Sequence, residues 1–204
     1  KESVRDRLIE YIKEAIVKFY GNSPATTDGY GKIINEKRFD KLVSYLSQGK
    51  IIYGGESNRE KLFIAPTLIE GVSLDSPIMQ EEIFGPILPI ISFREDEEAV
   101  AIIRRNPNPL SFYVFTSSKQ REEYWLERVQ FGAGCINNAV WQFSNHHLPF
   151  GGVGQSGIGA YHGKSSFDVF THTKSVMKTP TWFDPDLKYP PMKGKLGLLK
   201  MIVR

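Results

Sequence analysis

The stretch ILPIISFREDEEAVAIIRRNPNPLSFYVFTSS, residues 87–118, decides the fold class. Its first part, 87–93, is an apolar run typical of a buried strand. In 95–106 the acidic residues come first and the arginines last, which suits the dipole of a helix. The part 110–118 is again rich in β-branched and aromatic residues, as strands are. A strand, a helix and a second strand in this order indicate an α/β fold with a mostly parallel sheet flanked by helices.

The flanking segments continue this alternation of strands and helices. Apolar residues at three- and four-residue spacing predict helices, and short apolar segments beside glycines predict strands. The helices are expected over 1–21, 30–50 and 119–132, and the strands over 50–55, 62–72 and 134–140. Pro66 lacks an amide hydrogen, so 62–72 is expected to be an edge strand or a bulged one.

Two of these helices have an apolar side that we expect to face a core. Glycine just past the last periodic residue is a common helix end, so the first helix should end at Gly21 and the helix over 119–132 at Gly132. The residues expected to face inward are Val4, Leu8, Tyr11, Ile12, Ala15, Ile16 and Phe19 in the first helix, and Ile34, Phe39, Leu42, Val43 and Leu46 in the second.

The composition limits the function classes. The chain has 204 residues, 41% of them hydrophobic and 24% charged, as in globular proteins. The net charge of +3 is small and the cationic residues are dispersed, so nucleic-acid binding is not expected. One cysteine cannot form an internal disulfide, so a reducing compartment, the cytoplasm, is expected. No apolar run is long enough to span a membrane and no signal peptide opens the chain.

Gly152, Gly154 and Gly157 form the pattern G-x-G-x-x-G, which in dinucleotide-binding folds lies between a strand and a helix. Neither side fits that context. Pro149 precedes the pattern where a strand should end, and Gly159 weakens the helix that should follow. The position about twenty residues further on is a methionine rather than an acid. The glycines therefore predict a tight loop in which backbone approaches backbone or a ligand, not a cofactor fingerprint.

A second stretch, residues 76–93, places two acids beside an aromatic ring. In an extended segment Glu82 and Phe84 share one face, and Glu81 and Ile83 share the other. An acid beside an aromatic side chain can hold a ribose by hydrogen bonds and flank a flat ring. An exposed glutamate and a core phenylalanine before a Gly-Pro turn explain the same residues, and local physics alone favours that explanation.

Two long motifs, MQEEIFGPILPI at 79–90 and LPFGGVGQSGIGAYHGKSSFDVFTH at 148–172, resemble the aldehyde dehydrogenase superfamily. YGKIIN at 30–35, GVGQSGIGAYHGK at 152–164 and KYPP at 188–191 resemble its class 3 branch, which includes the fatty aldehyde dehydrogenases. The resemblance spans essentially the whole chain. It implies part of the catalytic domain over residues 1–163, and an oligomerisation strand with a C-terminal tail over 164–204.

The resemblance also implies an activity. Members of the family oxidise aldehydes to carboxylic acids with NAD or NADP, through a thiohemiacetal and a thioester on a cysteine. The family motifs for the nucleophile, the general-base glutamate, the oxyanion asparagine and the cofactor domain are not found here. The resemblance implies that they lie upstream of the first helix found here, and the chain alone is expected to be inactive. The alternative is a non-catalytic binding or assembly protein that retains the fold.

Specific residues take roles from the resemblance. In the family motif the second glutamate binds the nicotinamide ribose and the phenylalanine lies against the nicotinamide, which implies these roles for Glu82 and Phe84. The glycine-rich loop implies a wall of the substrate tunnel. The expected pocket residues are Asn137, Val140, Phe143, Ser144, Phe150, Tyr161 and His162. Their apolar character suits an aromatic or a medium- to long-chain aldehyde.

The single cysteine and the four histidines are further candidates for a catalytic or metal site. Cys135 lies in a predicted strand, where a lone cysteine is usually a small core residue, so it is not expected to be the nucleophile. His146 and His147 point apart in an extended segment, and the four histidines have no metal-ligand spacing, so no metal site is expected.

The C-terminal segments are expected to serve assembly. Residues 171–178 resemble the extended family segment that crosses to the partner subunit of a homodimer. In 193–204 an apolar side is expected, formed by Leu196, Leu199, Ile202 and Val203. Such a helix can pack on protein or lie on a membrane surface, and packing on protein is favoured because the segment is short and only modestly basic.

Overall fold

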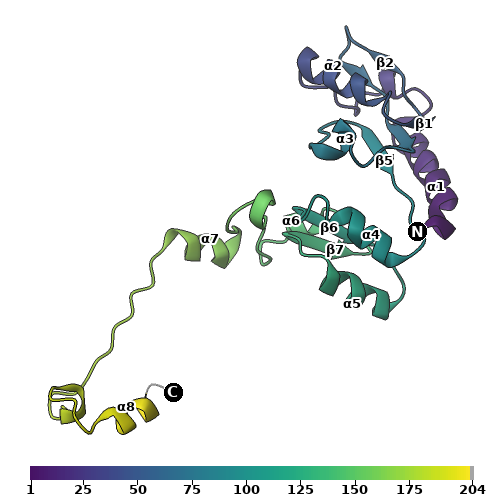
Figure 1. The fold of residues 1–204 in the computed structure, drawn as a ribbon. Coiled ribbons are helices and arrows are strands. Elements are labelled where there is room, and N and C mark those ends of the chain that lie inside the picture. Colours follow the sequence, from purple (N-terminus) through teal and green to yellow (C-terminus); the bar gives the residue numbers. More distant parts are fainter. Residues whose placement is uncertain (203–204) are drawn as a thin grey trace.

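The computed structural model describes residues 1–202, which form two lobes and an extended tail (Figure 1). The first lobe contains α1 (Glu2–Tyr20), η1 (Pro24–Thr26), α2 (Glu36–Tyr45), β1 (Lys50–Tyr53), β2 (Ser57–Asn58), β3 (Phe63–Ile64), β4 (Thr67–Glu70), α3 (Pro77–Gln80) and β5 (Ile87–Ile90). The second lobe contains α4 (Asp96–Ile103), β6 (Ser111–Val114), α5 (Lys119–Arg128), β7 (Ala133–Ile136), α6 (Trp141–Ser144), η2 (Gly154–Ser156) and α7 (Gly163–Phe170).

The sheet of the first lobe has the strand order β1-β4-β5. β4 pairs antiparallel with β1 and parallel with β5, with Ile69 opposite Ile51 and Thr67 opposite Ile87. β4 is therefore a central strand rather than an edge. Pro66 separates β3 from β4, which belong to different sheets, so the single strand predicted over 62–72 is two short strands. The register shift between Ile51 and Tyr53 places an extra residue in β1 and not in this segment, so neither the edge nor the bulge predicted for it describes β4.

The second helix supplies much of the core of the first lobe. Phe39, Leu42 and Tyr45 of α2 are buried against the sheet. Asn35 caps the helix, since its side chain accepts a 2.8 Å hydrogen bond from the amide of Arg38. The helix therefore begins after Ile34. Ile34 was predicted to face inward, but it is 84% exposed.

The first helix ends where predicted, but several of its residues that were predicted to face inward are exposed. α1 ends before Gly21, whose φ of 69° is a conformation that glycine adopts without strain. It buries Ile9 and Ile16. The residues predicted to face inward but found exposed are Val4, Leu8, Tyr11 and Phe19. The physical reason is that α1 contacts the lobe along a narrow line, so half of its apolar side has no partner within residues 1–202.

The second lobe contains a strand–helix–strand unit made of the segments predicted over 110–118, 119–132 and 134–140. β6 and β7 are parallel, with Tyr113 opposite Cys135, and their connecting helix α5 buries Trp125 against α4. α5 ends before Val129 rather than at Gly132, because Val129 adopts an extended conformation and is buried. β5 and β6, however, belong to different sheets, and two of the four strand pairings in the described part are parallel.

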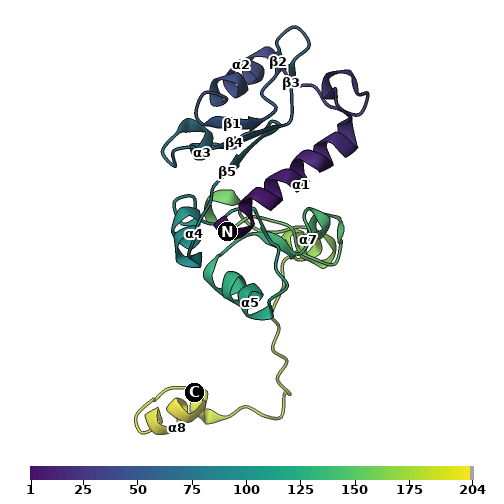
Figure 2. The ribbon, with the colours of Figure 1, turned by 90° about the vertical axis from the view of Figure 1, so that its right-hand side faces the viewer.

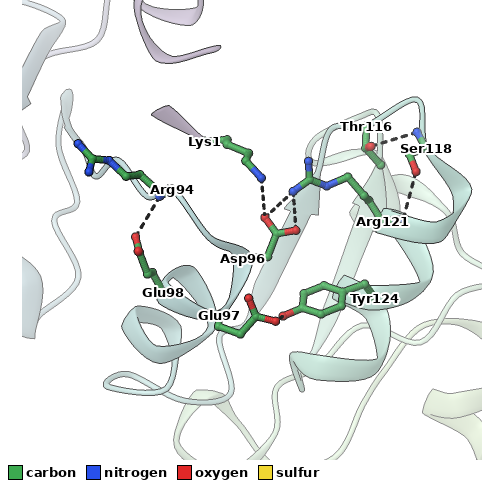
Figure 3. A network of polar contacts seen from close by, with 9 residues as sticks. All are labelled: Lys1, Arg94, Asp96, Glu97, Glu98, Thr116, Ser118, Arg121 and Tyr124. Atoms are coloured by element: carbon green, nitrogen blue, oxygen red, sulfur yellow. Dashed lines mark hydrogen bonds and ion pairs between the residues drawn. The ribbon is translucent and has the colours of Figure 1, made fainter. Parts of the chain in front are cut away.

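The start of α1 joins the two lobes, and both views place it beside the second lobe (Figures 1 and 2). The amide of Glu2 donates a 2.8 Å hydrogen bond to the carbonyl of Phe93. Figure 3 shows Asp96, at the start of α4, between Lys1 at 3.8 Å and the guanidinium of Arg121 on α5. This polar network fixes how the two lobes meet at that end of α1.

The tail leaves the second lobe after α7 and has two short elements, η3 (Asp186–Lys188) and α8 (Leu196–Ile202). Residues 171–180 are extended and exposed, and among the described residues they pair with no strand (Figure 1). On α8, Leu196 and Ile202 are exposed while Leu199 is half-buried; Val203 lies outside the described residues. None of the helices in residues 1–202 combines the length and apolarity required to cross a bilayer.

Candidate functional site

An open groove of about 1050 Å³ lies between the segment leading into α2, the exposed side of α2 and the loop of residues 81–85. Its lining residues are Gly31, Lys32, Ile33, Ile34, Asn35, Lys37, Arg38, Lys41, Glu81, Phe84 and Gly85. The groove therefore combines several cations with one acid and an aromatic ring.

The loop of residues 81–85 does not have the geometry of a strand. Phe84 has a φ of 45°, so the alternation of faces expected for an extended segment ends there. As a result Glu81 and Phe84 line the same groove, and the prediction that they face opposite sides is wrong. The ring of Phe84 is 73% exposed, so it is available to a flat ligand and is not a core residue.

The two neighbouring acids of this loop have different partners. Glu81 forms a 2.7 Å ion pair with Lys41 on α2, and this hydrogen bond holds the pKa of the Glu81 carboxyl below its usual value. Glu82 is exposed, and its carboxylate forms no ion pair or hydrogen bond with the described residues. Glu82 is therefore the acid of this pair that is left to accept hydrogen bonds from a ligand.

Four of the predicted pocket residues come together in the second lobe as an aromatic cluster of Phe143, Phe150, Tyr161 and His162. Phe150 and Tyr161 exchange two backbone hydrogen bonds of 2.9 Å. The ring of Phe150 lies 5.1 Å from that of Phe143 and stacks 6.0 Å from that of His162. Phe143 and Tyr161 remain about half exposed, so the cluster presents apolar ring surface to its surroundings.

The glycine-rich stretch is a tight loop, as predicted. No strand leads into it, and its centre is the single turn η2. A methyl group added at Gly151 would collide with the carbonyl oxygen of Gly159, and one at Gly152 with the backbone of Ser156 and Gly157. Backbone therefore approaches backbone at these positions, which brings Phe150 next to Tyr161.

The other three predicted pocket residues lie around the end of β7. Asn137 has a φ of 55°. Its side-chain oxygen accepts a 2.8 Å hydrogen bond from the backbone amide of Thr116, and its side-chain nitrogen donates a 2.9 Å hydrogen bond to the carbonyl of Thr116. Val140 is 62% exposed just before α6. The hydroxyl of Ser144 donates to the carbonyl of Trp141 at 3.0 Å. Asn137 therefore joins β7 to the end of β6.

Cys135 is half-buried on β7, as predicted. Its thiol lies 2.9 Å from the side-chain oxygen of Gln142, and the amide nitrogen of Gln142 lies 3.0 Å from the Tyr113 hydroxyl. The bond to Gln142 lowers the pKa of Tyr113. Within residues 1–202, no three His, Cys, Asp or Glu side chains gather closely enough to hold a metal ion.

Arg38 and Lys41 are two groove residues that the sequence patterns did not predict as site residues. Both lie on the groove side of α2, and both contact the loop that carries the predicted cofactor residues. Their spacing of three positions on a predicted helix places them on one face, and this was the available signal.

Known proteins share both the sequence and the fold. The chain is 43% identical over 201 residues to the 4,4'-diaponeurosporen-aldehyde dehydrogenase of Staphylococcus aureus, which covers 98% of this chain and 44% of the relative. It is 45% identical over 202 residues to aldehyde dehydrogenase family 3 member H1 of Arabidopsis thaliana, covering 97% of the chain and 42% of the relative. It is 37% identical to the dimeric NADP-preferring aldehyde dehydrogenase of Canis lupus familiaris, covering 95% and 43%.

Solved structures of known proteins superpose on this chain. A substrate-bound Staphylococcus aureus AldH superposes with a TM-score of 0.90 and 42% identity over all of this chain and 45% of that one. An indole-3-acetaldehyde dehydrogenase solved with NAD⁺ superposes with a TM-score of 0.73 and 28% identity over 86% of this chain and 37% of the other. The chain thus spans less than half the length of these proteins.

The family model described as the aldehyde dehydrogenase family matches residues 1–176. The partial α/β catalytic-domain fold agrees with that match, and the class 3 relatives agree with it over nearly the whole chain. This chain belongs to the aldehyde dehydrogenase family, and it resembles members of the class 3 branch.

Proposed function

We propose that this chain is the C-terminal part of an NAD(P)-dependent aldehyde dehydrogenase that oxidises aldehydes to carboxylic acids. The observation that carries the proposal is the loop of residues 81–85, where Glu82, whose carboxylate has no partner within residues 1–202, adjoins an exposed ring, Phe84. Family membership supports the reaction class.

The loop fits a nicotinamide nucleotide. The Glu82 carboxylate, which accepts no hydrogen bond from the described residues, can accept hydrogen bonds from both hydroxyl groups of a ribose, and the exposed face of Phe84 can lie against a flat pyridine ring. The cofactor, when bound, supplies the acceptor for the hydride. The NAD⁺ complex of one solved relative and the NADP-preferring name of another support both nucleotides as candidates.

The aromatic cluster and its neighbours Asn137, Val140 and Ser144 are proposed to form one wall of the substrate pocket. The exposed rings of Phe143 and Tyr161 offer apolar surface and no charge, which favours an apolar aldehyde, aromatic or of medium to long chain. One relative is named 4,4'-diaponeurosporen-aldehyde dehydrogenase.

The nucleophilic cysteine and the general-base glutamate are proposed to lie on a segment outside this chain, together with the cofactor domain. Cys135 lies in a strand with its thiol against Gln142, which does not suit a nucleophile. In the proposed reaction the thiolate adds to the aldehyde carbon, a hydride leaves, and water hydrolyses the resulting thioester. This chain holds the cofactor and the substrate in position and is inactive by itself.

Residues 164–204 are proposed to bridge to a second subunit of a homodimer. The extended shape of residues 171–180 and exposed apolar side chains such as Val176, Met177 and Trp182 support a buried role in an assembly. Residues 1–163 then form the part of the catalytic domain present here.

The test compares aldehyde-dependent formation of NADH and NADPH by this chain and by the protein at its full genomic length. We expect the full-length protein to be active, the chain to be silent, and Glu82→Gln and Phe84→Ala to weaken cofactor binding in the full-length protein. A folded full-length protein that reduces neither nucleotide with any aldehyde would contradict the proposal and leave the non-catalytic assembly role. Activity of the chain alone would contradict the placement of the nucleophile.

A further inference from the structure

Arg38 connects α2 to the loop that carries Glu82 and Phe84. Its guanidinium donates a 2.6 Å hydrogen bond to the backbone carbonyl of Glu82 and a second hydrogen bond to the carbonyl of Ile83. The same guanidinium lies 5.9 Å from the centre of the Phe84 ring, within the range of a cation–π contact. One half-buried side chain therefore contacts three successive residues of the loop.

The conformation of the loop requires such an anchor. Phe84 has a φ of 45°, which side chains other than glycine rarely adopt and which persists only where the surroundings impose it. Packing of the Phe84 side chain does not impose it, because Phe84 is 73% exposed, although the neighbouring Ile83 and Gly85 lie against the core. The contacts with Arg38 are the ones that reach both the backbone before Phe84 and its ring.

A second cation on α2 completes the arrangement. Lys41, one turn after Arg38, forms the 2.7 Å ion pair with Glu81 and turns that acid toward the helix. Because Arg38 donates to backbone carbonyl oxygens and not to the Glu82 carboxylate, that carboxylate has no partner among residues 1–202. Two cations on one helix face thus separate the roles of two adjacent glutamates.

We propose that Arg38 is a positioning residue: it holds the backbone of residues 82–84 so that the Glu82 carboxylate and the Phe84 ring are presented together to the cofactor. The identity of the ligand rests on the proposed function, whereas the holding of the loop by Arg38 does not. Arginine suits this task better than lysine, since its planar guanidinium donates in two directions while its face lies along an aromatic ring.

Three variants of the full-genomic-length protein test this. Arg38→Met keeps the apolar stem but removes the charge and the donors, and Arg38→Lys keeps the charge without the planar group. Lys37→Met is the matched control, because Lys37 lines the same groove and its side chain forms no hydrogen bond or ion pair with the described residues.

The first measurement uses no cofactor. A glutamyl endopeptidase cleaves after Glu81 and Glu82 when the loop opens, and mass spectrometry locates the cut. We expect cleavage to be about tenfold faster in Arg38→Met and about threefold faster in Arg38→Lys, and unchanged in Lys37→Met. The unfolding midpoint should stay within a few degrees of the unmodified protein in all three variants.

The second measurement is the dissociation constant of NADH and of NADPH from their fluorescence. Arg38→Met should weaken binding about tenfold, and Arg38→Lys should restore part of the loss. Cleavage at the unmodified rate in both Arg38 variants overturns the proposal; if Arg38→Met does not fold, Arg38→Lys decides it alone. If the unmodified protein binds neither nucleotide, the proposed function fails, and the cleavage rates still decide whether Arg38 holds the loop.

Discussion

The two loops that carry the candidate site are held in place by opposite means. The loop of residues 81–85 is held by long side chains of a neighbouring helix, Arg38 on its carbonyls and Lys41 on Glu81. The loop between Phe150 and Tyr161 is held by its own backbone, which approaches itself at glycines where no side chain fits.

This difference determines how each loop responds to substitution. Contacts made by flexible, partly exposed side chains weaken by degrees, because solvent and neighbouring groups replace them in part. A close approach of backbone to backbone allows no such compensation, since the interior packs without spare volume. We therefore expect large effects in the glycine loop and graded effects around residues 81–85.

The largest expected effect is that of Gly152→Ala. The added methyl group would collide with the backbone of Ser156 and Gly157, which should cost about 3 kcal/mol of unfolding free energy. Gly159→Ala is the control: Gly159 has a φ of 75° but open space around it, so only backbone strain of about 1 kcal/mol is expected. Urea unfolding of the full-length protein measures both. Equal losses would show that close approach is not what holds this loop.

An intermediate effect is expected at Asn137, where side chain and backbone both act. Asn137→Ala removes two hydrogen bonds to Thr116 and leaves alanine at a φ of 55°, for a loss of about 2 kcal/mol. Asn137→Gly removes the same bonds without the strain, so it should lose about 1 kcal/mol. If glycine is as harmful as alanine in urea unfolding, the hydrogen bonds alone explain the role of Asn137.

The smallest effect is expected for the ion pair of Lys41 with Glu81, which is exposed and screened by salt. The hydrogen bond from Lys41 lowers the pKa of Glu81, so the pair stabilises the folded protein above the usual carboxyl range and loses that contribution as pH falls through the lowered pKa. Lys41→Met should return the pKa of Glu81 upward toward its usual value, as followed by carboxyl NMR. Lys37→Met should leave it unchanged, and an unchanged pKa in Lys41→Met would contradict the pairing.

Much of the fold was predictable because it depends on neighbours in the sequence. The helix end at Gly21, the order of strand, helix and strand along residues 87–118 and the tight glycine loop follow from local patterns, whereas the placement of those two strands in different sheets does not. The inward side of α1 was not predictable, because Leu8 and Ile9 are both apolar and only the position of the sheet decides which of them is buried.

The candidate site, like the fold, has some features that follow from the sequence and others that depend on the tertiary structure. The sequence by itself determined the family, through motifs whose residue order can be read directly, and it determined that Glu82, Phe84 and the aromatic residues around the glycine loop are the candidates. The tertiary structure alone decided that Glu81 is paired and Glu82 is free, and that Arg38 reaches Ile83 from 45 positions away in the chain. The physical reason is that a hydrogen bond forms between groups that are close in space, and strand alternation cannot describe a loop that turns at a φ of 45°.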